Sequence, residues 1–419
     1  MDKGTTNDIQ GQIPEVVQSL DELAREGARR MILAALEVEV EQYLQKLRHL
    51  RDEQGHALVV RNGKAQSRTV SLGAGSIELQ APRVHDRRTE QRFTSQILPP
   101  YLRRSPKVAE VLPILYLRGL STGDFRPALE GLLGKEASGL SPTTVSRLVS
   151  EWESEYELFR KRSLANRDYV YVWVDGVHFR IRLEDDRLCT LVMIGARPDG
   201  TKELVAVEDG YRESTESWRT VLRDLKRRGM QAPAVAVGDG ALGFWAAVRD
   251  VWPETREQRD WCHKLANVLD KLPKRLQGQA KRALREAMYA EKRADAEKAL
   301  DSFAAEYGAK YPKAVECVQR DREKLLTHFE FPAEHWKHLR TSNPIESPFA
   351  TVRLRQRVTK GAGSRSKGLL MAFKLLDMAQ RRWRKLDGAH LLPLVRAGAT
   401  FVDGVQQERI EVKPRRKAA

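Results

Sequence analysis

The hydrophobic pattern in the centre of the chain predicts a β-sheet. In 167–184, valines alternate with aromatic residues and with Asp175, and β-forming residues resume after Gly176. This is the pattern of a long buried strand. Residues 187–200 and 202–210 predict a second and a third strand, and Asp-Gly pairs mark turns at their ends.

Helical periodicity then alternates with one further strand. Residues 214–230 and 241–254 predict amphipathic helices, and the short apolar run 234–240 predicts a buried parallel strand. Three antiparallel strands, a crossover helix and a parallel fourth strand make an α/β arrangement. Asp239 lies at the carboxyl end of the fourth strand, where α/β sheets place their ligand sites.

The flanking regions have different patterns. Residues 14–50 predict an amphipathic helix or a helical hairpin, whose apolar stripe can pair with a second copy of the chain. Short β-prone runs in 58–83 predict a small β-ribbon. Residues 264–335, rich in Ala, Glu, Lys and Arg, predict an all-helical insertion, and 338–386 predict two helices around a basic Gly/Ser loop.

A helix expected from Pro142 onward favours a helix-turn-helix. Ser141 occupies the capping position and Pro142 the first helical position. Any capped amphipathic helix can share this pattern, but its polar first turns suit insertion into the major groove of DNA. The residues expected to contact DNA are Thr143, Thr144, Ser146 and Arg147.

The charge of the chain points to a polyanionic partner. The 419 residues carry a net charge of +16, which favours nucleic acid over a membrane surface. Residues 337–387 alone contain thirteen Lys and Arg against three acids, so a polyanion is expected to lie across them. Three widely spaced cysteines, no CxxC, no signal-peptide pattern and no membrane-spanning run fit a reducing cytoplasm.

Asp175 stands out as a carboxylate within an apolar strand. A charge there costs several kcal/mol unless a hydrogen-bond network or a cation compensates it. The alternative is a β-bulge at Asp175 and Gly176, in which the carboxylate caps backbone groups. Asp209, by contrast, has the pattern of a turn residue, and Trp218 and Trp245 that of core residues.

Glu346 is the best candidate for a third acid beside Asp175 and Asp239. Asn343 is expected to cap its helix, with Pro344 at the first helical position. Asn343 and Glu346 also have the spacing of a capping box, which alone would account for Glu346. Because of Pro348, the regular helix could instead begin only at residues 347–348.

Three carboxylates that converge on one point require cations. Oxygen ligands of this kind suit Mg²⁺, and two such ions would activate a water or a 3′-hydroxyl for phosphodiester transfer. If the helix is continuous, Arg353 lies two turns beyond Glu346 on the same face. The phosphate-binding row expected on this element consists of Arg353, Arg355, Arg357 and Lys360.

The chain contains four short motifs in a fixed order: VDG at Asp175, GDG at Asp239, DWCH at 260–263 and SNPIES at Glu346. In this order they resemble the DDE transposases of the bacterial insertion-sequence relatives of the Mutator elements. The resemblance covers nearly the whole chain and implies an RNase H-like fold, a mixed sheet flanked by helices and interrupted by the helical insertion. It also implies that Asp175, Asp239 and Glu346 are the catalytic triad.

The resemblance gives Asp260 and His263 a role close to the active site, organising it or the cleaved DNA end. Helix capping by Asp260, with a contact from His263 to Asn267, is the structural alternative. The implied cofactor is a pair of Mg²⁺ ions, for which Mn²⁺ can substitute.

The function implied is that of a DNA transposase. At least a dimer would bind the terminal inverted repeats in double-stranded DNA, cut the element end with water, and use the freed 3′-hydroxyl to attack target DNA. An RNase H-like structure-specific nuclease and a non-catalytic DNA-binding regulator derived from a transposase stay open as alternatives.

The patterns and the resemblance together predict seven segments. The N-terminal region, helical and then a β-ribbon, is expected to bind DNA and to dimerise. The segments are 1–55 (helical), 56–105 (β-ribbon and basic linker), 106–163 (helix-turn-helix), 164–263 (first part of the catalytic domain), 264–335 (insertion), 336–390 (second part) and 391–419 (basic tail).

Overall fold

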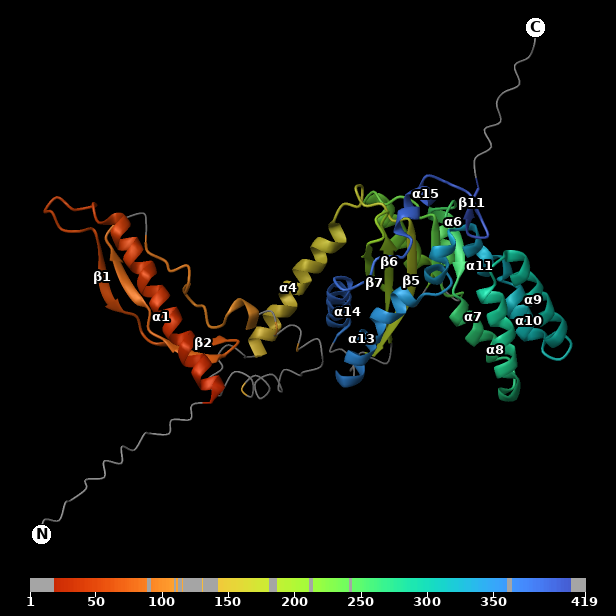
Figure 1. Cartoon of the computed structure of the whole chain (residues 1–419), viewed down its shortest axis with the longest axis horizontal. Helices are drawn as coiled ribbons and strands as arrows, with labels where there is room; N and C mark the ends of the chain where they lie inside the picture. Colours follow the sequence, from red (N-terminus) through yellow and green to blue (C-terminus); the bar gives the residue numbers. More distant parts are fainter. Residues whose placement is uncertain are drawn as a thin grey trace, which may run out of the picture. The chain divides into compact units, whose positions relative to one another are not determined.

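The chain folds into two compact units, residues 1–148 and 149–419 (Figure 1). The computed structural model describes residues 19–88, 92–108, 111, 115, 130, 142–180, 187–210, 214–240, 243–359 and 364–407.

The first unit is built on one long helix, α1 (Leu20–Leu47), and not on a helical hairpin. Its start is fixed by a capping box in which Ser19 Oγ accepts from the Glu22 amide and the Glu22 carboxylate accepts from the Ser19 amide. The predicted β-ribbon consists of two antiparallel pairs, the hairpin of β2 with β3 and the pair that β1 forms with β4. The strands are β1 (Val59–Lys64), β2 (Arg68–Leu72), β3 (Gly75–Leu79) and β4 (Pro82–Asp86).

One face of α1 covers these strands, and the other carries exposed apolar side chains. The core contains Leu36, Val70, Ile77, Leu79 and Leu98. The exposed apolar residues of the helix are Leu20, Leu23, Met31 and Val38.

Helix α4 (Pro142–Lys161) begins at Pro142, as the sequence predicted. The rest of the expected helix-turn-helix, with Ser141, lies outside the described residues apart from a few isolated positions. The later turns of α4 belong to the second unit, where the Tyr156 hydroxyl donates to the Val207 carbonyl at 2.8 Å and the Tyr156 ring packs on Phe373.

The second unit contains a five-stranded mixed sheet in the order β7-β6-β5-β8-β9. The strands are β5 (Tyr171–Arg180), β6 (Arg187–Ala196), β7 (Lys202–Gly210), β8 (Val235–Gly238) and β9 (Arg256–Arg259). The first three are antiparallel neighbours, and β8 and β9 run parallel to β5. The α/β arrangement predicted from the sequence is therefore confirmed.

Two local predictions about this sheet are wrong. The ladder between β5 and β6 passes through Asp175 and Gly176 without a register shift, so no bulge accounts for Asp175. Asp209 is not a turn residue: it lies within β7 and forms an ion pair with Arg365. The sequence also missed β9, because Arg-Glu-Gln-Arg carries no β-forming pattern and only the neighbouring β8 makes it a strand.

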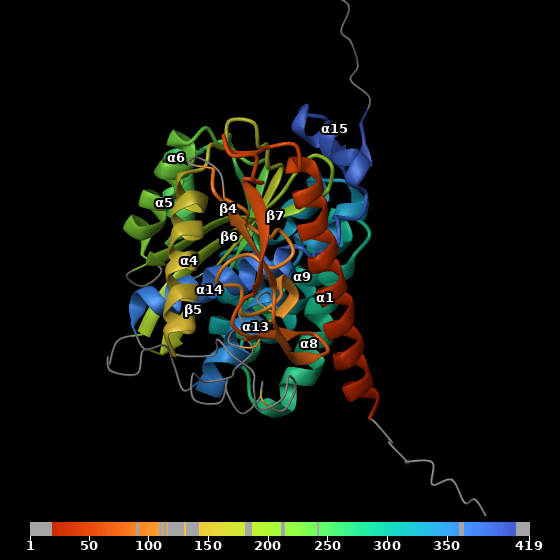
Figure 2. The same cartoon turned by 90° about the vertical axis from the view of Figure 1, so that its left-hand side faces the viewer.

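Helices cover both faces of the sheet (Figures 1 and 2). On one face α5 (Thr215–Arg227) and α6 (Phe244–Val251) bury Trp218 and Trp245 in the main core, as predicted. On the other face lie α13 (Asn343–Thr359) and α14 (Arg365–Gln380), which contact β5, β6 and β7.

The predicted insertion is helical throughout. Its helices are α8 (Lys274–Tyr289), α9 (Arg293–Tyr307), α10 (Pro312–Gln319), α11 (Arg322–Leu326), η1 (Thr327–Glu330) and η2 (Ala333–His335). With α7 (Trp261–Leu269), which precedes them, they share a separate core and gather beyond β9 at one end of the unit (Figure 1). Helix α12 (Trp336–Leu339) leads back to the sheet.

Residues 391–419 were assigned from sequence to a basic tail, but the structure is folded from 389 up to 407. They form η3 (Ala389–Leu391), α15 (Leu392–Arg396) and the hairpin β10 (Phe401–Val402) with β11 (Val405–Gln406). Arg396 holds this segment in place by pairing with Asp168 and donating to the Tyr169 carbonyl. None of the helices in the described ranges is long and apolar enough to cross a membrane.

Candidate active site

Strand register brings three carboxylates to one edge of the sheet. Val174 of β5 pairs with Gly238 of β8, and Gly238 pairs with Arg259 of β9. The residue that follows each of these is an aspartate: Asp175, Asp239 and Asp260. Because the three strands are parallel, these aspartates lie in successive positions along the carboxyl edge, where α/β sheets bind ligands.

The alternation of side chains assigns Asp175 to the face covered by α12 and α13. Val172 and Val174 belong to the core under α5 and α6. Trp173, on the opposite face, donates from Nε1 to the His338 carbonyl at 2.8 Å. Asp175 shares the face of Trp173, since side chains two apart on a strand point the same way.

The backbone of Asp239 is held by two side chains. Trp245 Nε1 donates to the Asp239 carbonyl at 2.6 Å, and Arg259 Nη1 donates to the same oxygen at 3.4 Å. The Arg259 guanidinium lies over the Trp245 ring, 4.2 Å from its centroid, and 3.6 Å from an oxygen of Asp321. The loop that carries Asp239 is thereby connected to the helical insertion.

Glu346 lies in the first turn of α13, which runs without interruption from Asn343 through Pro348. The expected cap at Asn343 is wrong, because the Ser342 carbonyl accepts from the Glu346 amide at 3.0 Å and Ser342 is the residue before the helix. Ser342 Oγ also donates to Glu346 Oε1 at 3.0 Å. The alternative that the helix begins only at residues 347–348 is likewise excluded. Glu346, an acid in the first turn, complements the positive end of the helix dipole.

Asp260, His263 and Glu346 form a compact cluster. Each offers a ligand atom within 4.8 Å of the others, and no second such group of three occurs in the described part of the chain. His263 Nδ1 lies 3.3 Å from Asp260 and 3.5 Å from Glu346. Asp260 is buried and caps α7 by accepting from the His263 amide at 2.7 Å. Asp260 therefore both caps α7 and lies close to His263 and Glu346.

Electrostatics give the cluster a positive centre. The Asp260 carboxylate, helped by the charges of Asp239 and Glu346, raises the pKa of His263 to about 9. Burial alone would raise the pKa of Asp260, but hydrogen bonds from His263 and Ser342 outweigh burial and lower it. At neutral pH a protonated imidazole therefore lies among the acids of this edge.

The carboxylates of Asp175 and Asp239 are adjacent to this cluster but not part of it. Asp175 Oδ1 accepts from the Gly176 amide at 2.8 Å, and Asp239 accepts from the Gly240 amide. Four carboxylates at one sheet edge, with His263 as a nearby cation, repel each other unless further positive charge is present. This oxygen-rich donor set fits Mg²⁺.

The residues predicted to bind DNA, apart from Lys360, fall in two helices. Thr143, Thr144 and Ser146 are helical positions in α4 whose side chains lie outside the described residues, and Arg147 is exposed. In α13, Arg353 is exposed, with its guanidinium carbon 6.0 Å from the Phe349 ring centroid. The side chains of Arg355 and Arg357, and all of Lys360, lie outside the described residues.

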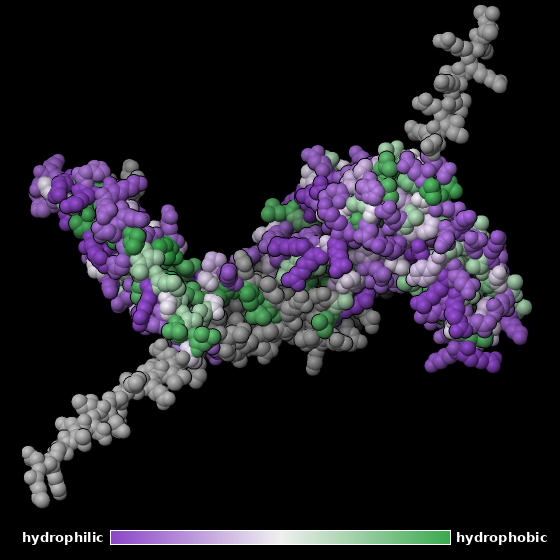
Figure 3. Space-filling view, viewed as in Figure 1, coloured by the Kyte–Doolittle hydropathy of each residue, from purple (hydrophilic) through white to green (hydrophobic). Residues whose placement is uncertain are grey.

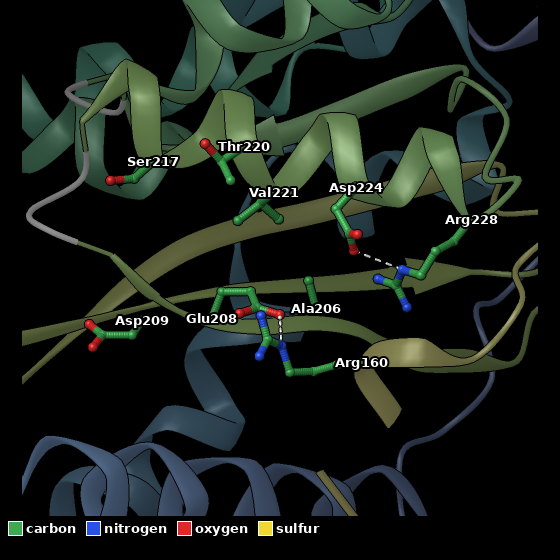
Figure 4. Close-up of a pocket in the computed structure, with 9 residues that line it drawn as sticks. All are labelled: Arg160, Ala206, Glu208, Asp209, Ser217, Thr220, Val221, Asp224 and Arg228. Carbon is green, nitrogen blue, oxygen red and sulfur yellow. Dashed lines mark hydrogen bonds and ion pairs between the residues drawn. The ribbon is translucent and has the colours of Figure 1, made fainter. Parts of the chain in front are cut away.

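A hollow between α5 and β7 is lined by residues that include none of the carboxylates Asp175, Asp239, Asp260 and Glu346 (Figure 4). Its volume is about 320 Å³. The charges in it are already paired: Arg160 with Glu208 at 3.0 Å, and Arg228 with Asp224 at 2.9 Å. The fifth charge of the lining, Asp209, pairs with Arg365 from outside the hollow. Every charge of this α5–β7 hollow therefore already has a partner, and it is not the candidate site.

Sequence patterns gave no sign of the residues that support the site. Trp245 was assigned only to the core, Arg259 to a region leading into helices, and Ser342 had no role. A serine preceding Asn-Pro could have indicated the helix start. The contacts of Arg259 and Trp245 with Asp239 follow from tertiary packing and have no local signal.

Known proteins resemble this chain along most of its length. Residues 2–364 match the family described as "Transposase, Mutator family". The transposase for insertion sequence element IS6120 of Mycolicibacterium smegmatis is 57% identical over 302 residues, 72% of this chain and 93% of the relative. The transposase for insertion sequence element IST2 of Acidithiobacillus ferrooxidans is 49% identical over 286 residues, 66% of this chain and 94% of the relative. The chain belongs to the Mutator family of transposases.

Proposed function

We propose that this chain binds the terminal inverted repeats of an insertion sequence and catalyses metal-dependent DNA cleavage and strand transfer. Asp175, Asp239 and Glu346 are its catalytic carboxylates and hold two Mg²⁺ ions. The observation that carries this proposal is the in-register placement of Asp175 and Asp239 on neighbouring parallel strands, on the sheet face that α13 covers with Glu346.

Two bound Mg²⁺ ions supply activation of the attacking oxygen and stabilisation of the leaving oxygen in phosphodiester transfer. The side chains of the protein position and charge the site. Ser342 orients the Glu346 carboxylate, Trp245 and Arg259 fix the backbone of Asp239, and Asp260 holds His263 protonated. The His263 imidazolium is placed to attract a DNA phosphate or to donate a proton to a leaving 3′-oxygen.

The exposed Arg353, two turns along α13 from Glu346, supports a path for the DNA strand beside the carboxylates. A guanidinium at this position contacts phosphate oxygens in bidentate fashion and neutralises backbone charge. Arg355, Arg357 and Lys360 extend the same basic segment, and the polar residues at the start of α4 are proposed to contact the repeat sequence.

Purified protein, DNA carrying the element ends, target DNA and Mg²⁺ test the proposal. We expect cut ends and joined products from the wild-type chain, and neither from Glu346→Gln. Cutting without joining would favour an RNase H-like nuclease, and binding that needs no metal and cuts nothing would favour a regulator. Glu334→Gln, an acid outside the carboxylate edge, is the matched control and should cut and join normally.

A further inference from the structure

The helical insertion contains a hollow with unusual charge. It lies between α7 and α10 and has a volume of about 340 Å³. Asn267 and Lys271 line one side, and the other lining residues come from α10 and its C-terminal end. These are Lys313, Glu316, Cys317 and Arg320. We call it the α7–α10 hollow; it holds three cations and one acid.

The three cations of the hollow form no ion pair with an acid among the described residues, as is also true of other exposed basic residues such as Lys281 and Arg285. Within the described ranges, no acid pairs with Lys271, Lys313 or Arg320, whereas Arg293 and Arg322 pair with acids on neighbouring helices. With Glu316 as the one acid of the lining, the hollow keeps an excess of two positive charges, which raises the local potential. The α5–β7 hollow, where each arginine has its acid, differs in this respect.

Interaction with the helix dipole accounts for the positions of two of the three cations. Lys271 and Arg320 follow the C-terminal ends of α7 and α10, where cations complement the helix dipole. Lys313 lies in the first turn of α10, directly after Pro312 at the helix start, where the dipole disfavours a cation. The exposed Lys313 is thus a cation that the helix does not use, and its charge is available to an anion in the hollow.

A buried lysine, Lys264, connects the two helices that border the hollow. Lys264 Nζ donates to the Cys317 carbonyl at 3.0 Å and pairs with Asp321. Because Lys264 belongs to α7, these bonds join α7 to the end of α10 and preorganise both walls. A preformed site loses little conformational entropy when it binds.

Helix α7 connects the hollow to the carboxylate edge. His263 and Asn267 are four residues apart on this helix, so they lie on one face, about 6 Å apart along the axis. Lys271, just past the helix end, is roughly 12 Å from His263 by the same rise. One DNA strand advances about 3.4 Å per nucleotide, so about two to four nucleotides span this distance.

We propose that the α7–α10 hollow binds backbone phosphates of the DNA strand, a few nucleotides from the phosphate that reacts at the carboxylate edge. This rests on the proposed function. The insertion thereby sets the position of the DNA end in the site through Lys271, Lys313 and Arg320. Its surface in Figure 3 is largely hydrophilic, as a backbone-contacting surface requires.

The salt dependence of DNA binding tests the proposal without relying on cleavage. The triple variant Lys271→Ala, Lys313→Ala, Arg320→Ala is compared with a control of equal charge change, Arg282→Ala, Lys292→Ala, Lys298→Ala, on exposed positions of α8, of α9 and of the turn between them. Fluorescence anisotropy with labelled end DNA gives log Kd against log salt concentration. Circular dichroism and thermal unfolding establish that both variants are folded.

We expect the slope to fall by about 2 to 3 in the hollow variant, about 0.9 per lost phosphate contact, and by less than about 1 in the control. Equal slopes for wild type and hollow variant would overturn the proposal. A second result would also overturn it: inorganic phosphate stabilises the wild type, but the salt slope of DNA binding is the same in wild type and hollow variant. The hollow would then be a site for free phosphate. If wild-type protein binds DNA but cuts nothing, the proposed function fails while the slopes still decide this proposal.

Discussion

The backbone amide of Ser342 donates a hydrogen bond to the buried carboxylate of Asp260, 82 residues earlier in the chain. The same carboxylate caps α7, so α7 and α13 both begin at one acid. Glu346 follows one turn into α13 and accepts from Ser342 Oγ. Asp260 therefore fixes where Glu346 lies relative to the sheet edge.

Replacing Asp260 separates its charge from its hydrogen bonds. Asp260→Ala removes a helix cap and leaves the buried Ser342 amide without an acceptor, so the free energy of unfolding should fall by about 2–4 kcal/mol. Asp260→Asn keeps one acceptor oxygen for the two amide donors, so its cost should be smaller than that of Asp260→Ala, while the pKa of His263 moves down from about 9. Denaturant unfolding and histidine NMR titration measure the two effects. Equal destabilisation by Ala and Asn would contradict the double-cap role.

Asp239→Asn should abolish cleavage while DNA binding persists. Loss of one proposed metal ligand removes several kcal/mol of transition-state stabilisation, which corresponds to about a 10³-fold or greater fall in rate. Single-turnover cleavage and anisotropy measure the two properties. Asp199→Asn, in the exposed turn between β6 and β7, is the control and should cleave normally. Cleavage by Asp239→Asn near the wild-type rate would show that Asp239 is not a metal ligand.

Trp245→Phe tests the contact that holds the Asp239 backbone. Phenylalanine keeps an aromatic ring at this position, but the hydrogen bond from the indole Nε1 to the Asp239 carbonyl is lost. A small shift of the carboxylate should lower the cleavage rate by about 10- to 100-fold. Trp218→Phe is the matched control, because Trp218 Nε1 has no hydrogen-bond partner among the described residues. Similar cleavage rates for both variants would argue against a positioning role.

Removal of divalent cations should separate binding from chemistry. With EDTA, the wild-type chain is expected to bind end DNA but to produce neither cut nor joined products, and Mg²⁺ or Mn²⁺ should restore both. Gel assays of cut and joined DNA over a metal titration measure this. Products formed at the full rate in EDTA would refute a metal-dependent mechanism.

His328 should make the protein less stable in acid. Burial and the charge of Arg340 lower its pKa to about 3, while Nδ1 lies 3.0 Å from the Leu325 carbonyl. Between pH 3 and 6.5, His328 binds a proton in the unfolded chain but not in the folded chain. Its contribution to the free energy of unfolding therefore decreases as the pH falls through this range.

His328→Gln removes this titration and can keep the hydrogen bond to Leu325. The stability difference between wild type and variant should therefore shrink by about 2 kcal/mol from pH 7 to pH 5. Denaturant unfolding at both pH values measures it, with the exposed His390→Gln as a control for loss of a histidine. A difference that does not change with pH would contradict a neutral buried His328.

Local patterns were sufficient for most of the elements. Alternation along β5 and the apolar run of β8 predicted both strands, and helical periodicity predicted the insertion. These signals are local, because one buried face imposes its period on the sequence. The polar strand β9 and the folded segment after 388 have no such signal and depend on neighbours distant in the chain.

The sequence by itself determined the family and the α/β order of the second unit, and it predicted which acids are the candidates for the site, because motif residues and periodicity are properties of short segments. Tertiary structure alone decided that Asp260 joins the starts of two helices, that Ser342 and not Asn343 precedes α13, and that Trp245 and Arg259 hold Asp239. Each of these is a hydrogen bond formed only once strands and helices have packed. No local pattern specifies which distant donor a carboxylate or carbonyl will meet.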